Sequence, residues 1–266
     1  MDKALGPGFA KAHHISYQGI GQGAYGLAHL LASKHLSADV FISVTPGPAR
    51  LLLRKGLLKS AAPVASTQMV IAYSPKSRFA PQFKAAGKGG TPWYKVLEQP
   101  GVRFGRTDPA TDPQGRNILF TFQLAQRYYH QPGLVSKVLG GYQNPKQIFS
   151  ESSLLTRLES GQIDASSGYL SAVKSRHLPY IQLPSQINLS NPAYMQAWYS
   201  RAGVTLNGKT IKPQPLVFYA GVLANTQHPR LAQHFIDYLE SRRGQRLLQQ
   251  YGYGKPLGGT LRESGP

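Results

Sequence analysis

The residues best placed to do chemistry are Asp112, Pro113 and Gln114, in a polar stretch that follows the short apolar run 102–104. Aspartate is a favoured helix N-cap, and proline is favoured at the first helical position. The backbone N–H groups that follow lack partners inside the helix and lie at its positive end, so they can bind a small anion. A well-capped helix that binds nothing accounts for the same residues.

Two further polar turns are expected to follow strands. A glycine-rich turn, 19–23, comes after a strand candidate at 15–19 and before a helix over 25–32, and the turn 166–169 follows 163–165. Ligands of open α/β sheets bind beyond the carboxyl ends of strands. Together with the turn at 107–114, this predicts a small polar ligand held by backbone N–H and hydroxyl groups.

The elements that must position these turns alternate between strands and helices, which predicts an α/β fold with a parallel or mostly parallel sheet. The expected strands, mostly apolar, are 38–44, 69–73, 180–184 and 216–223. The expected helices are one starting at 49, an amphipathic helix after Asp112, one over 154–159 capped by Ser152 or Ser153, and a long one from 228 to 251.

The composition of the chain limits the classes of protein to which it can belong. The chain has 266 residues, 41% hydrophobic, enough for one large or two medium domains with a packed core. The formal charge of +19 concentrates anions near the surface. Because the basic residues are scattered and no nucleic-acid motif occurs, we expect no nucleic-acid partner. There is no cysteine, and no apolar run approaches the roughly 18 residues of a membrane span.

Other chemistries are poorly supported. The turn 19–23 has neither Rossmann glycine spacing nor a P-loop ending, and the eight histidines lack metal-ligand spacing. Ser167 lacks the G-x-S-x-G context of a nucleophile. Asp108 and Asp112 offer only a weak acid–base pair. His13 and His14 are expected on the surface, and the aromatic pairs at 128–129 and 198–199 in the core or on a lobe surface.

Four segments in order resemble the molybdate/tungstate-binding branch of the periplasmic substrate-binding proteins of ABC importers. Residues 105–116 are similar to its G-R-x-x-P-x-x-D-P-x-G-Y-R motif, and 69–77 look like its crossover strand. Residues 154–164 resemble its L-x-S-G-x-x-D helix and strand, and 182–189 its x-L-P-x-x-I-N-L exit. With weaker matches at 38–43 and the C-terminal helix, the resemblance covers nearly the whole chain.

The resemblance implies a two-lobe type II periplasmic-binding-protein-like fold with two crossover strands. Lobe I would comprise residues 1–72 and 186–266, and lobe II residues 73–185. It further implies an oxyanion clamped between the lobes, closure on binding, and delivery to a membrane permease. No chemistry on the ligand and no cofactor are expected, and the protein would be a periplasmic or cell-surface monomer. Since the chain shows no signal peptide and the family's first strand has no counterpart in it, we expect a truncated start.

The family's binding residues carry over only in part. Its second serine falls on Ala24 or a neighbour, and the motif's aspartate is Asp112, with Asp108 as a near competitor. Its tyrosine falls on Asn117 or is absent, and its arginine is Arg116, kept or shifted by one. The branch's glutamate, which precedes a Tyr-x-Ser segment matched here by Tyr169, falls on Gly168 and is lost.

The resemblance implies that a pair of carboxylates in that branch ligates the metal of the oxyanion directly. With one carboxylate gone, we expect a tetrahedral oxyanion held by hydrogen bonds, with Asp112 acting as a helix cap and no side-chain ligand to a metal. Molybdate, tungstate and sulfate all fit this expectation. The residues expected to bind the ligand are Gly23, Ala24, Tyr25, Thr45, Asp108, Asp112, Gln114, Gly115, Arg116, Ser152, Ser167, Gly168 and Tyr169.

Two rival functions share the architecture. The chain could be the effector-binding core of a transcription regulator, but no helix-turn-helix is visible in the sequence. It could also be an enzyme acting on a small anion, but no convergent nucleophile or base is found. The receptor for an oxyanion importer therefore remains the leading interpretation.

Overall fold

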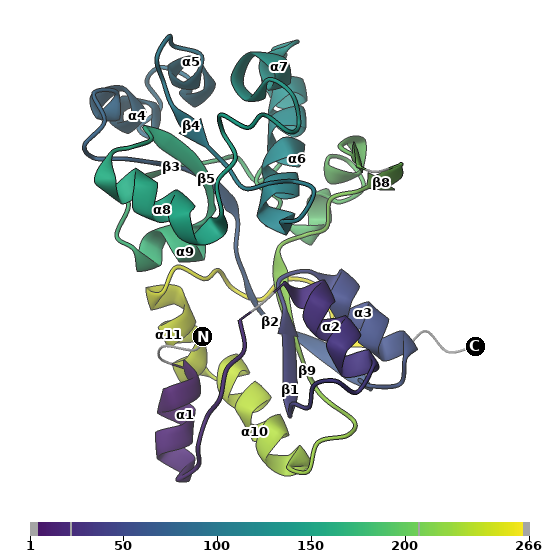
Figure 1. The fold of residues 1–266 in the computed structure, drawn as a ribbon. Coiled ribbons are helices and arrows are strands. Elements are labelled where there is room, and N and C mark those ends of the chain that lie inside the picture. The colour runs from purple at the N-terminus through teal and green to yellow at the C-terminus, as the bar shows by residue number, and fades with distance from the viewer. Residues whose placement is uncertain (1–4, 22, 207, 263–266) are drawn as a thin grey trace. The chain divides into compact units, whose positions relative to one another are not determined.

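A computed structural model describes residues 5–21, 23–206 and 208–262, and of residues 151 and 152 it describes the backbone alone. The chain folds into two compact units (Figure 1). The first unit combines residues 1–67 and 214–266, and the second unit comprises residues 68–213. Each unit is described by itself below.

The first unit is built on a four-stranded sheet in the order β1-β9-β2-β10. β9 (Val217–Val222) lies between β1 (Val40–Ser43) and β2 (Ser60–Ser66) and is antiparallel to both. β10 (Leu261–Arg262) pairs with the outer edge of β2. The predicted strands at 38–44 and 216–223 are confirmed, because both are apolar runs buried in this sheet.

Helices cover both faces of this sheet (Figure 1). α2 (Ala24–Ala32) and α3 (Pro46–Arg54) pack on one face, where Leu31 and Leu52 meet Phe41 of β1. α1 (Leu5–His13), α10 (Pro229–Glu240) and α11 (Arg242–Gln250) pack on the other, around Phe9 and Leu239. The sheet is therefore buried on both sides, which is why its strands read as apolar runs.

The second unit contains a four-stranded sheet in the order β4-β5-β3-β6. β3 (Met69–Tyr73) is buried along its whole length and is antiparallel to β5 (Ala165–Tyr169) and β6 (Tyr180–Gln182). β4 (Phe104–Gly105) pairs with β5 in parallel. β5 thus lies inside the sheet, next to the loop that leaves β4.

Two groups of helices enclose this second sheet. α8 (Glu151–Ser160) and α9 (Leu170–Ser175) pack on the face that carries Val70 and Ala72. The longest helix, α6 (Pro113–Tyr128), places Phe122 against Phe104 of β4, with ring centroids 6.0 Å apart. The remaining elements are α4 (Ala80–Ala86), α5 (Trp93–Leu97), α7 (Leu134–Leu139), the 3₁₀ turns Pro192–Tyr194 and Tyr199–Arg201, and the hairpin β7 (Val204–Leu206) with β8 (Lys209–Ile211).

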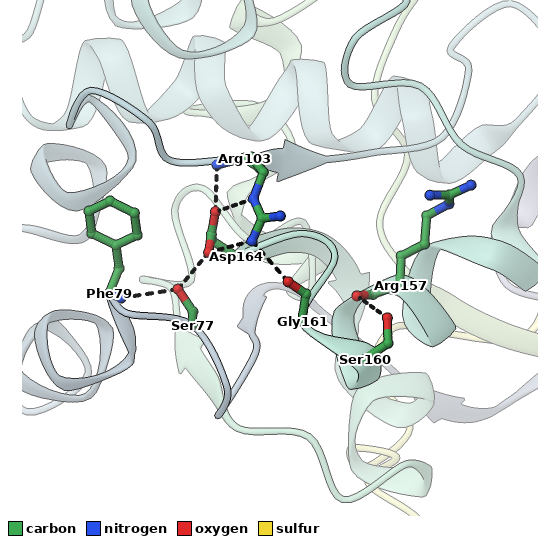
Figure 2. A network of polar contacts seen from close by, with 7 residues as sticks. All are labelled: Ser77, Phe79, Arg103, Arg157, Ser160, Gly161 and Asp164. Carbon is green, nitrogen blue, oxygen red and sulfur yellow. Dashed lines mark hydrogen bonds and ion pairs between the residues drawn. The ribbon is translucent and has the colours of Figure 1, made fainter.

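Asp164, which directly precedes β5, anchors that strand (Figure 2). Its carboxylate accepts hydrogen bonds from the Arg103 backbone N–H at 2.8 Å, the Arg103 Nε at 3.0 Å and the Ser77 hydroxyl at 2.7 Å. Arg103 Nη2 also donates to the Gly161 carbonyl at 2.9 Å. Burial raises the pKa of Asp164, but the hydrogen bonds from Arg103 and Ser77 outweigh it and hold the pKa below its ordinary value.

The prediction of a parallel or mostly parallel sheet is wrong. Among the pairs of strands that the structure describes, β4 with β5 is parallel and the others are antiparallel. The physical reason is that β9, from the end of the chain, runs between β1 and β2 against both of them. The strand expected at 15–19 is also absent, since these mostly exposed residues pair with no described strand.

Three local expectations also need correction. The long C-terminal helix is broken at Ser241, which leaves helical geometry and caps α11 by accepting a hydrogen bond from Gly244 N. α8 begins earlier than expected and is capped by Ser150, which accepts from Ser153 N, and not by Ser152 or Ser153. The turn expected at 166–169 lies within β5, because Ser166, Ser167 and Gly168 are small enough for the buried part of this strand.

The second unit extends further along the chain than the lobe expected at 73–185. Residues 186–213 pack within it: Asn188 O accepts from Met69 N at 2.9 Å, and Gly203 N donates to the Gln123 side chain at 2.9 Å. β3, which the expected division placed at the end of lobe I, is a central strand of this unit.

Candidate functional site

The start of α6 has the geometry that the sequence predicts. Asp112 has extended backbone angles (φ −117°, ψ 126°), and its Oδ1 accepts a hydrogen bond from Gln114 N at 2.8 Å. Pro113 occupies the first helical position, where no N–H is needed. The helix is 16 residues long, so its positive end is well formed.

The loop from β4 folds tightly over this helix start. Asp108 accepts from Ala110 N through its carboxylate, at 2.8 Å, and from Asp112 N through its carbonyl, also at 2.8 Å. Arg116 Nε donates to the Pro109 carbonyl at 2.9 Å. A Cβ at Gly115 would lie 2.5 Å from the Thr107 carbonyl oxygen, so only glycine permits this approach. The loop and the helix start therefore form one rigid polar surface.

Two side-chain pairs connect α6 with β5. The Ser167 hydroxyl donates to Gln114 Oε1 at 3.1 Å, and Asn117 Nδ2 donates to the Tyr169 hydroxyl at 2.9 Å. Ser167 and Tyr169 are two apart on the strand, so they project to the same face. The structure thus brings together Gln114, Ser167 and Tyr169, predicted from separate motifs, although Ser167 lies in a strand and not in a loop tip.

Burial and neighbouring charges both act on Asp112 at the helix start. Burial raises the pKa of Asp112, while the Gln114 N–H and the charge of Arg116 partly offset that rise. Asp112 remains an acceptor that uses one oxygen to cap the helix. A carboxylate beside the amides opposes an anion, so nearby cations must compensate if a dianion is to bind.

Gly168 lies on the opposite side of β5 from Ser167. A Cβ at this glycine would meet Val173 Cγ2 of α9 at 2.6 Å. The position is thus packed against α9, and a larger side chain would require Val173 to move. The side chain of Ser152 lies outside the described residues, although its backbone belongs to α8.

The candidates of the first unit lie at two helix starts. Gly23 is the N-cap of α2 and makes no side-chain cap, and Ala24 and Tyr25 are its first residues. Thr45 is the N-cap of α3 in extended geometry, also without a side-chain cap. Gln22, in the preceding turn, lies outside the described residues.

Gln214 connects these two helix starts and was missed by the sequence analysis. Its Oε1 accepts from Gly47 N in α3 at 2.9 Å, and its Nε2 donates to the Tyr25 hydroxyl at 3.4 Å. The only signal in the sequence is a polar residue between Pro213 and Pro215, which fits a loop equally well. Its position beside α3 depends on the return of the chain to the first unit.

Metal binding by side chains finds no support in the part of the chain that the structure describes. No group of three or more His, Asp or Glu residues there could hold a metal ion. None of the described helices combines the length and apolarity needed to cross a membrane.

A model for the bacterial extracellular solute-binding proteins matches residues 1–254 of this chain. The chain belongs to this family. Among curated relatives, the molybdate/tungstate-binding protein WtpA of Pyrococcus abyssi is 31% identical over 207 residues, and that of Thermococcus kodakarensis is 30% identical over 207. Each match covers 70% of this chain but only 59% and 57% of the relatives, so the chain spans less than two thirds of their length.

Solved structures agree on the fold. The periplasmic molybdate-binding protein of Azotobacter vinelandii superposes with a TM-score of 0.61 and 18% identity, covering 95% of this chain and 93% of that chain. The two-lobe periplasmic-binding-protein fold and the family expected from the four sequence motifs are therefore confirmed. These related proteins are substrate-binding proteins and not enzymes.

Proposed function

We propose that this chain captures a tetrahedral oxyanion, molybdate or tungstate with sulfate as a competitor, and delivers it to the permease of an ABC importer. The observation that carries the proposal is the start of α6, where the loop from β4, the first turn of the helix and the residues of β5 form one polar surface. The molybdate/tungstate-binding relatives support the ligand class.

The donors at this surface suit a ligand that carries no proton. Molybdate, tungstate and sulfate are acceptors only, so each oxygen needs an N–H or O–H donor. Hydrogen bonds to an ionised oxyanion are the stronger class, and the positive end of α6 adds to them. Gln114 is held by Ser167 through its oxygen, which leaves its amide group to act as a donor.

The packing at Gly168 favours an oxyanion held by hydrogen bonds over one whose metal atom is ligated by a side chain. A direct metal ligand at this position would need a carboxylate, but the residue is glycine and its side-chain direction is filled by Val173. Asp112 is committed through Oδ1 to the cap. We therefore infer that the oxyanion keeps its four oxygens and gains no second carboxylate from this chain. Closure of two lobes on the ligand, which the family resemblance implies, remains a prediction.

Calorimetric titration of the purified protein with molybdate, tungstate, sulfate and phosphate tests the proposal. We expect saturable one-to-one binding of molybdate and tungstate, and weaker binding of sulfate and phosphate. Absence of heat from all four anions, in protein shown to be folded by circular dichroism, would refute it. Stimulation of the ATPase activity of a reconstituted importer by the loaded protein tests the delivery step.

A further inference from the structure

Arg106 is a buried cation without an anionic partner in the second unit. It follows β4 directly and is 0% exposed. Its Nε donates to Gln147 Oε1 at 3.2 Å, and its Nη2 donates to the Gly141 carbonyl at 3.0 Å. Its Nη1 is buried and has no hydrogen-bond partner within the described part of the chain.

Burying the charge of Arg106 costs free energy, which is unexpected if the residue only connects Gln147 and Gly141 to the loop. A buried charge is ordinarily paired with an opposite charge, because desolvation is expensive. Both acceptors of Arg106 are uncharged, and the described residues provide it with no ion pair. An uncharged donor could hold the same two acceptors at lower cost. Burial lowers the pKa of Arg106 and the charge of Asp108 raises it, but arginine remains protonated in proteins.

The place of Arg106 in the chain suggests what its charge does. It lies two residues before Asp108, in the loop that folds over the start of α6. That start carries the carboxylates of Asp108 and Asp112, which oppose an anion, and Arg116, which compensates one of them. The charges of Arg106 and Asp108 act on each other, so the buried guanidinium of Arg106 adds a second positive charge within electrostatic range of these carboxylates.

We propose that Arg106 is a positioning residue whose buried charge makes the start of α6 selective for doubly charged over singly charged oxyanions, without contacting the ligand. The inference rests on the proposed function. A Coulomb interaction is proportional to the charge of the ligand, and low local polarity keeps a buried charge from being screened. The factor by which Arg106 strengthens binding of a dianion is therefore about the square of its factor for a monoanion.

Tungstate and perrhenate provide matched probes, because both are tetrahedral oxyanions of similar size and differ by one charge. Dissociation constants for both are measured by calorimetry in the unmodified protein and in the variants Arg106→Gln and Arg106→Lys. The control is Lys137→Gln, which removes an exposed charge from α7 beside the Gly141 loop. Urea unfolding of each variant checks that it folds.

We expect Arg106→Gln to weaken tungstate about tenfold and perrhenate about threefold, and Arg106→Lys to restore most of both losses. Lys137→Gln should change neither by more than about twofold, because its charge is screened. Equal losses for the two anions in Arg106→Gln, or no loss for tungstate, would overturn the inference and assign Arg106 a purely structural role. Should Arg106→Gln not fold, a loss of the tungstate-to-perrhenate preference in Arg106→Lys overturns it equally.

The experiment separates the two claims. Unmodified protein that binds neither anion refutes the proposed function and the inference together. Unmodified protein that binds tungstate, with equal losses for both anions on removal of the Arg106 charge, refutes the inference alone.

Discussion

Removing the carboxylate of Asp164 should destabilise the second unit without unfolding the first. Asp164 is 3% exposed and accepts four hydrogen bonds, from the Arg103 backbone, the Arg103 side chain twice and Ser77. The Arg103 side chain is 54% exposed, so its ion pair contributes at most about 1 kcal/mol. The Arg103 N–H and the Ser77 hydroxyl are more costly to leave unpaired, at about 1–3 kcal/mol each.

These contributions set the expected magnitudes. In Asp164→Ala the Arg103 N–H and the buried Ser77 hydroxyl both lose their acceptor, so we expect a loss of about 4 kcal/mol in the free energy of unfolding. In Asp164→Asn the amide nitrogen fits best at the Oδ1 position, where the Ser77 hydroxyl can turn to accept and only the exposed Arg103 Nη2 loses its acceptor. The Arg103 N–H then keeps a neutral acceptor, and the expected loss is about 2 kcal/mol.

Tryptophan fluorescence during urea unfolding is the appropriate assay. The chain has two tryptophans, Trp93 and Trp198, and both lie in the second unit, so the signal reports that unit alone. The midpoint should fall while the slope stays unchanged. Glu159→Gln is the matched control, because it removes a carboxylate whose partner, Arg176, is exposed. A loss below about 0.5 kcal/mol in Asp164→Asn, or an equal loss in Glu159→Gln, would refute the reasoning.

The pH dependence follows from the direction of the shift. Because the pKa of folded Asp164 is lowered, its stabilisation is fully present above the unfolded pKa of about 4 and is lost as the pH falls through the folded pKa. The difference in unfolding free energy between the unmodified protein and Asp164→Asn should therefore shrink as the pH is lowered below about 4. A difference that is independent of pH there would contradict this account.

Four further predictions concern the start of α6. Gly115→Ala should destabilise the second unit by several kcal/mol, because the added Cβ would meet the loop backbone. Gly26→Ala is the control at the equivalent third position of α2, where the space is open, and it should stabilise the chain by about 0.5–1 kcal/mol. Thermal melts of the two variants compare these effects. Asp112→Asn keeps a capping oxygen and removes a charge that opposes the ligand, so sulfate should bind more tightly; abolished binding would show direct ligation instead. Since burial raises the pKa of Asp112, the sulfate affinity of the unmodified protein should rise as the pH is lowered and Asp112 takes up a proton, and Asp112→Asn should lack this rise. Ser167→Ala frees Gln114, so oxyanion affinity should fall about threefold to tenfold with little change in thermal stability.

The sequence was most informative where a local rule operates. Asp112, Pro113 and the amphipathic run after them predict the start of α6, since capping depends on neighbouring residues. The buried strand 69–73 was predicted from its apolar run for the same reason. Sequence reasoning failed where contacts with distant parts of the chain decide the local structure. Residues 15–19 resemble a strand in sequence but pair with no described strand. Ser241 interrupts the C-terminal helix although the sequence on both sides of it is amphipathic.

By itself, the sequence determined the helix start, the absence of cysteine chemistry and the family, because these depend on residue types at short spacing. Only the tertiary structure decided that Ser167 meets Gln114, that Gln214 reaches α3, and that Arg106 is buried without an ion pair. Those contacts join residues between 35 and 167 positions apart, and the closest of them joins Arg106 to Gly141. They depend on which strands pair in the folded chain, and the spacing of neighbouring residues carries no record of that pairing.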